Sequence, residues 1–153
     1  RIPDTSHSIA AGVASGMAVS FTPFLGLHFL MGFGVAWLTR GNMLASAIGT
    51  AVGNPWTFPF IFAMTAKIGS AILGRDVLSN VPDWSWDTLL VSPYDYLSSF
   101  LPLIFPLIIG GLLTGVIVWL LGYFVFKAVL DSYRNARAER LKRKGVTDYG
   151  ANS

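Results

Sequence analysis

Two proline-containing breaks interrupt the apolar first half of this sequence of 153 residues. Thr22 precedes Pro23 in the first break, and Asn54 precedes Pro55 in the second, with Thr57 close behind. Thr or Asn at an N-cap accepts a hydrogen bond from a free backbone N–H, and proline at the first helical position loses no needed donor. Each break therefore predicts a helix start, whose N–H groups and positive dipole end suit an anionic lipid headgroup. The alternative is that these residues only satisfy the backbone at unavoidable breaks.

Three more residues near the breaks are candidates for ligand binding: Gly26, His28 and Lys67. An imidazole titrates near neutral pH, so His28 is able to contact a ligand or carry a proton, although a lone histidine in an apolar stretch is more often structural. Lys67 is either a functional cation inside the membrane or a side chain that reaches the interface. Residues 5–75 contain no Asp or Glu, which argues against a carboxylate proton relay and against carboxylate acid/base catalysis.

No enzyme signature is present. The sequence lacks a phosphate-binding glycine loop followed by Lys-Ser/Thr, a GxSxG motif and an HExxH motif. It has no cysteine and only two histidines, which makes a protein-ligated metal site hard to assemble. We expect no catalytic residue, no metal and no cofactor.

The composition is that of a membrane protein. Hydrophobic residues make up 53% and charged residues 12% of the chain, whereas soluble domains have about 25% charged residues. Most of the Lys and Arg residues lie between Lys127 and Lys144, directly after a long apolar segment. This placement favours an anionic lipid surface over nucleic acid as the partner.

The hydropathy pattern predicts one all-α, polytopic membrane domain. Residues 97–126 are uncharged and long enough to form a spanning helix, which needs about 20 residues. Residues 8–39 and 43–74 form two proline-broken helical units that bend or re-enter, because an unbroken helix of that length would exceed the hydrocarbon thickness of about 30 Å. An acidic extracytoplasmic loop (75–96) and a basic helical tail (127–153) complete the chain.

The charges around the last apolar segment predict its orientation. Positive residues mark the cytoplasmic side, so the C-terminus is expected to be cytoplasmic and the acidic loop to lie outside. If both early units re-enter, these two placements conflict, so one unit or the N-terminus must break the symmetry. The basic residues expected to lie against the membrane surface are Arg134, Arg137, Arg140, Lys142, Arg143 and Lys144.

Pairs of glycines four residues apart predict close helix packing. Shifting the sequence by 37 residues places Gly12 and Gly16 on Gly49 and Gly53, which indicates either a duplicated unit or chance in a glycine-rich segment. Internal repeats with broken helices are typical of transporters. The third pair, Gly111 and Gly115, lies in the predicted spanning helix, where association with a second copy is a further possibility.

At the break motifs the sequence resembles an uncharacterised bacterial membrane family, domain of unknown function 2062. The resemblance extends over most of the chain and implies a bacterial inner-membrane protein, but no reaction, substrate or cofactor. The positions most characteristic of the family are Pro23, Gly26, His28, Asn42, Asn54, Pro55 and Thr57.

Two functions remain open. The first is a non-catalytic accessory or structural subunit of a larger membrane complex, which would have other membrane proteins as partners. The alternative is a transporter or lipid-handling protein that binds an anionic headgroup at the helix starts near Pro23 and Pro55. Both place the chain in the inner membrane, in contact with anionic lipids, as a multi-pass protein.

Overall fold

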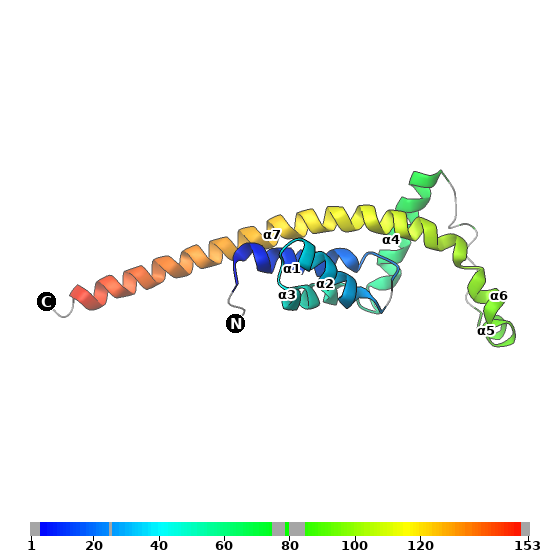
Figure 1. Cartoon of the computed structure of the whole chain (residues 1–153), viewed down its shortest axis with the longest axis horizontal. Helices are drawn as coiled ribbons and strands as arrows, with labels where there is room; N and C mark the ends of the chain where they lie inside the picture. The colour runs from blue at the N-terminus through cyan, green and yellow to red at the C-terminus, as the bar shows by residue number, and fades with distance from the viewer. Residues whose placement is uncertain (1–3, 25, 75–78, 80–84, 151–153) are drawn as a thin grey trace.

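The computed structural model describes residues 4–24, 26–74, 79 and 85–150 (Figure 1). These residues are helical and contain no strand, so the predicted all-α class is confirmed for this part of the chain. The elements are α1 (Ser6–Val19), α2 (His28–Leu38), α3 (Met43–Gly49), the 3-10 turn η1 (Thr50–Val52), α4 (Phe58–Leu73), α5 (Trp86–Val91), α6 (Pro93–Ser98) and α7 (Leu101–Gly150).

The long helix α7 is the frame on which the other helices pack. Helices α1, α2 and α3 lie along one side of it, α4 crosses it, and α5 and α6 lie at its N-terminal end (Figure 1). One helical stretch of the described chain, Pro93–Lys142, is long and apolar enough to cross a membrane, and α7 forms most of it. Residues 101–126 of the predicted spanning helix and residues 127–150 of the predicted basic tail are therefore parts of one continuous helix.

The acidic segment 75–96 differs from the simple loop that the sequence predicts. Residues 86–91 and 93–98 form α5 and α6, and Ser85 caps α5 by accepting a hydrogen bond from the backbone N–H of Thr88. Residues 75–78 and 80–84 of the predicted loop lie outside the described residues. The described part of the segment thus contains two short helices, because a serine cap and a proline each start a helical turn there; its extracytoplasmic location stays a prediction.

Both early units are broken where their prolines predict. Residues 20–27 separate α1 from α2, and residues 53–57 separate η1 from α4. Helices α1, α2 and α4 have 14, 11 and 16 residues, or lengths of about 21, 17 and 24 Å. Each is shorter than the hydrocarbon core of a bilayer, which is about 30 Å thick.

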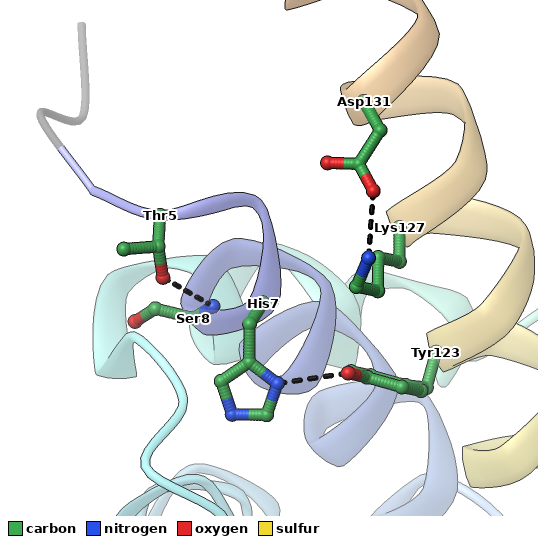
Figure 2. A network of polar contacts seen from close by, with 6 residues as sticks. All are labelled: Thr5, His7, Ser8, Tyr123, Lys127 and Asp131. Atoms are coloured by element: carbon green, nitrogen blue, oxygen red, sulfur yellow. Dashed lines mark hydrogen bonds and ion pairs between the residues drawn. The ribbon is translucent and has the colours of Figure 1, made fainter.

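The first unit returns to the end from which it starts. The Nδ1 atom of His7, at the start of α1, lies 2.8 Å from the hydroxyl of Tyr123 on α7 (Figure 2). The other ring nitrogen, Nε2, lies 3.2 Å from the carbonyl oxygen of Thr39, which directly follows α2. A carbonyl only accepts, so Nε2 carries the proton and Nδ1 accepts from Tyr123. The start of α1 and the end of α2 thus meet at one position on α7.

The second unit does not return. It starts beside the same end, where the backbone N–H of Asn42 donates to the carbonyl of Ser8. Its last helix, α4, contacts α7 at Pro106 through Gly69, about 25 Å along α7 from Tyr123. The two units therefore end at different positions along α7.

A carboxylate fastens the N-terminal segment to this end of the molecule. Asp4 Oδ2 accepts hydrogen bonds from Ser8 Oγ (2.7 Å) and Asn42 Nδ2 (3.0 Å), and Oδ1 accepts from the Thr5 N–H (2.8 Å). The guanidinium of Arg134 donates to the carbonyl oxygen of Asp4. Nearby, the Thr5 hydroxyl caps α1 and Lys127 pairs with Asp131 (Figure 2).

These hydrogen bonds make a pH-dependent contribution to stability. The bonds from Ser8 and then Asn42 hold the pKa of Asp4 below its usual range. The contribution is therefore present above the ordinary pKa and is lost as the pH falls through the lower folded-state value. We expect the melting temperature of the wild type to fall by a few degrees more than that of Asp4→Asn between about pH 5 and pH 3. Parallel melting curves over this range would contradict the assignment.

Candidate functional site

The two helix breaks, distant in sequence, form the walls of one cavity. We call it the break cavity, and its volume is about 320 Å³. The first break contributes Gly26 and His28, and the second contributes Gly53 and Phe58. The rings of His28 and Phe58 face each other with centroids 5.4 Å apart. The remaining lining residues are Phe29, Ala47, Thr50 and Ala51.

The second break is held by a side-chain cap. Asn54 Oδ1 accepts hydrogen bonds from the backbone N–H groups of Trp56 (2.9 Å) and Thr57 (3.1 Å). Thr57 Oγ1 donates to the carbonyl of Val52 across the break (2.6 Å). Asn54 thus caps the turn that starts at Pro55, and α4 begins four residues after this cap, at Phe58. Because Asn54 already bonds these N–H groups, they are not free for an anion.

The predicted helix start at Thr22 and Pro23 is wrong. The hydroxyl of Thr22 is buried and donates to the carbonyl of Val19 at 2.7 Å, so it closes the C-terminal end of α1. Helix α2 begins at His28, and its N-cap, Leu27, makes no side-chain cap hydrogen bond. Gly26, with φ of 88°, turns the chain between the two helices, a backbone angle that glycine adopts without strain.

His28 is a buried polar side chain in the wall of the cavity. The side chain is 8% exposed, and its Nε2 atom is buried with no hydrogen-bond partner in the described chain. A buried polar atom without a partner costs about 1–3 kcal/mol. The His28 ring therefore has an unmet hydrogen-bonding requirement at an atom that solvent does not reach.

The other candidate side chains lie elsewhere. Lys67 is on an exposed face of α4 and does not line the break cavity. Arg134 contacts Asp4, whereas Arg137, Arg140 and Lys142 are exposed along α7. For Arg143 and Lys144 the structure describes the helical backbone but not the side chains. The basic residues are thus separate from the cavity.

The paired glycines lie at close helix contacts within the chain. A Cβ on Gly12 or Gly16 would meet the backbone of Asn42 or Ser46, and one on Gly49 would meet that of Val13. The third pair contacts the end of α1 and the break after it, because a Cβ on Gly111 would meet the carbonyl of Phe21 and one on Gly115 would lie 3.0 Å from the carbonyl of Ala18. At Gly53 the nearest atom is the Ser20 side chain, at 2.8 Å. The face of Gly111 and Gly115 is covered by α1 and is not open to a second copy.

Two further glycines, missed from the sequence, fix α4 on α7. A Cβ on Gly69 would meet the carbonyl of Pro106, and a Cβ on Gly110 would meet that of Thr65. Each helix supplies one glycine, so a search for paired glycines within a single helix does not find them. The adjacent pair Gly110 and Gly111 is the sequence signal for this contact. A Cβ on Gly110 would meet Thr65 of α4, whereas one on Gly111 would meet Phe21 after α1.

The lining of the break cavity presents groups that could bind a ligand. The cavity lining includes no Lys, Arg, Asp or Glu. Within the described residues, no three His, Cys, Asp or Glu side chains gather as metal ligands would. What the site presents is a mainly apolar cavity with the side chain of His28 in its wall.

A family model described as an uncharacterised protein conserved in bacteria (DUF2062) matches residues 1–139. No curated protein and no solved structure matches the sequence.

Proposed function

This chain belongs to the bacterial family domain of unknown function 2062, and we propose that it is a non-catalytic inner-membrane protein that binds a lipid headgroup in the break cavity. The observation that carries the proposal is the meeting of the two breaks around one cavity with the buried side chain of His28 in its wall. Ligand sites are typically apolar cavities with a few placed polar groups. In many transporters they form where membrane helices are interrupted.

The same proposal gives the chain two crossings. Helix α7 spans the bilayer with Lys127 and the basic residues after it on the cytoplasmic side, by the positive-inside rule. The hairpin α1–α2 enters from that side and returns, and α3 with α4 crosses. Since α2 is about 17 Å long, the cavity at its N-terminal end lies near the middle of a bilayer about 30 Å thick.

The test is native mass spectrometry of the full chain purified in mild detergent. Ala51 lines the cavity and is exposed, so Ala51→Phe fills the space without entering a packed interface. We expect this variant to retain at least fivefold less co-purified lipid than the wild type. Gly34→Phe is the matched control, since nothing lies within 4 Å of a Cβ there. Equal lipid retention in all three proteins would overturn the proposal.

A second function, that of an accessory subunit in a larger complex, is favoured by the continuation of α7. The helix runs past Lys127 with Arg137, Arg140 and Lys142 exposed, and Lys142 lies about 22 Å beyond Lys127. An arm of this length passes the membrane surface and suits an acidic partner protein. We expect Gln at these three positions to remove partners that co-purify with the wild type at fixed stoichiometry. A wild type that brings no partner would contradict this function.

A further inference from the structure

We propose that an anionic phospholipid of the cytoplasmic leaflet binds along a groove between α2 and α7, with one acyl chain in the groove and its phosphate at Arg40. We call this groove the α2–α7 groove. The inference rests on the topology of the proposed function and adds a second lipid site. The two sites share no lining residue.

The α2–α7 groove consists of two cavities of about 180 Å³ each that follow one another along α7. They share three wall residues, Val35 of α2 and Val116 and Trp119 of α7. Helix α1 forms the floor, where Ala18 lies against Gly115 of α7. Because both floor residues are small, α1 packs close to α7 and the space above this contact stays open.

The groove fits an acyl chain in polarity, direction and length. Its lining includes no Lys, Arg, His, Asp or Glu, and the hydroxyls of Thr22 and Thr39 in its walls already donate to backbone carbonyls. Along α7, the proposed spanning helix, it extends from Gly111 to Leu120, or about 14 Å. This is close to half of a hydrocarbon core about 30 Å thick, the depth of one leaflet.

One end of the groove is at the cytoplasmic side of the proposed topology. Thr39 lines this end, and its carbonyl oxygen lies 3.2 Å from Nε2 of His7, whose other ring nitrogen contacts the hydroxyl of Tyr123 (Figure 2). Lys127 follows Tyr123 by one turn of α7. Trp37, in the last turn of α2, is 68% exposed, and tryptophan is typical of the headgroup level. A lipid with its chain in the groove therefore has its phosphate beside the end of α2.

Arg40 is the cation at this position. It directly follows Thr39, its side chain is exposed, and it forms no ion pair within the described residues, whereas Lys127 is paired with Asp131. Its φ is 54°, an angle that glycine adopts without strain and other residues rarely adopt. Helix α4 ends in the usual way, with Gly74 at φ of 64°. Arg40 thus has the backbone of a glycine position and a guanidinium that suits a phosphate, with which it forms paired hydrogen bonds.

The test adds lipid to the full-length chain purified in detergent and measures binding by native mass spectrometry. Lipid is added because the groove is open on its side: Leu112, Val116 and Leu120 in its wall are 54%, 58% and 47% exposed, so detergent replaces its lipid. The probes are dioleoyl phosphatidylglycerol and dioleoyl phosphatidylcholine, which differ in net charge but not in acyl chains. We expect the wild type to bind phosphatidylglycerol at least fivefold more tightly. Equal affinity for the two lipids would overturn the proposal.

Two variants at Arg40 test the headgroup contact without unfolding the chain. Arg40→Gly removes the cation and relieves the backbone, so we expect it to melt at the wild-type temperature or above it. Its preference for phosphatidylglycerol should fall below twofold. Arg40→Lys keeps a positive charge and should keep a preference of at least threefold. A preference that survives Arg40→Gly, or that Arg40→Lys loses to the same extent, would overturn the role of Arg40.

Val116→Trp fills the groove from its exposed wall. The matched control is Val125→Trp, because Val125 is on the same helix, is also 58% exposed and does not line the groove. We expect Val116→Trp to bind phosphatidylglycerol at least fivefold more weakly and Val125→Trp to bind it as the wild type does. Equal binding by the two variants would overturn the groove as the site. A wild-type dimer that Val116→Trp converts to a monomer would overturn it too, because a second copy would then cover the groove.

Ala51→Phe separates this site from the break cavity. It fills the break cavity and leaves the α2–α7 groove open, so we expect it to keep the wild-type preference for phosphatidylglycerol. Loss of the preference in Ala51→Phe would assign the preference to the break cavity and overturn the groove site. Equal co-purified lipid in Ala51→Phe and the wild type, with the effects at Arg40 and Val116 intact, would refute the proposed function and support the groove site.

Discussion

Gly16→Leu is expected to separate α1 from α3 and to lower the free energy of unfolding by about 3 kcal/mol or more. A Cβ at this position would meet the backbone carbonyl of Ser46 and would lie 2.6 Å from the backbone nitrogen of Thr50. Backbone atoms inside a helix do not move aside as the end of a flexible side chain does. The two helices would have to move apart along their whole contact, with the loss of its dispersion energy.

The measurement is thermal unfolding in detergent followed by circular dichroism, with Gly34→Leu as the matched control. Gly34 is also in a short apolar helix, but a Cβ there would have no neighbour within 4 Å. The control should unfold at the wild-type temperature or slightly above it, because leucine favours a helix by up to about 1 kcal/mol over glycine. If Gly16→Leu melts together with Gly34→Leu, α1 and α3 do not pack as described.

The same contact links the fold to the site. Helix α3 and η1 carry Ala47, Thr50 and Ala51, which form one wall of the break cavity, while α2 carries His28 in the other. Helix α1 lies against both walls, since a Cβ on Gly32 of α2 would also meet a side chain of α1, that of Val19, at 3.5 Å. A change at Gly16 should therefore weaken lipid binding although Gly16 does not line the cavity.

The sequence predicts the helical class and the location of both breaks, because proline and glycine limit the backbone locally. It does not predict which helix end a capping side chain serves. Thr22 lies after α1 and before α2, and its hydroxyl donates to the carbonyl of Val19, which precedes it in the chain. Asn54, in the equivalent position, bonds Trp56 and Thr57 ahead of it. The choice depends on tertiary contacts that local propensity does not contain.

Long-range contacts explain the remaining differences. The return of the first unit depends on His7, Thr39 and Tyr123, and His7 is separated from Tyr123 by 116 positions. Nothing in the pattern around His7 indicates this pairing, because a histidine near a helix start is compatible with solvent as well. The two units resemble each other in sequence, yet only the first closes on itself. Hydropathy and glycine spacing alone therefore left the direction of the second unit open.

Gly110→Leu is expected to release α4 from α7, with a loss of about 2–3 kcal/mol. A Cβ on Gly110 would meet the carbonyl of Thr65 and lie 2.8 Å from the nitrogen of Gly69. These are the backbone atoms of α4 at the point where it crosses α7. Unlike the change at Gly16, this one leaves the contact of α1 with α3 intact, so the loss should be confined to α4.

Hydrogen exchange measured by mass spectrometry separates the two helices. We expect amide exchange in Phe58–Leu73 to accelerate at least tenfold in Gly110→Leu, while exchange in Ser6–Val19 stays at the wild-type rate. Gly122→Ala is the control on the same helix, because the Cβ there would lie 3.6 Å from the sulfur of Met17, an ordinary contact. Acceleration in both helices would mean that the molecule opens as one unit. The contact at Gly69 and Gly110 would then not hold α4 on α7 independently of the other helices.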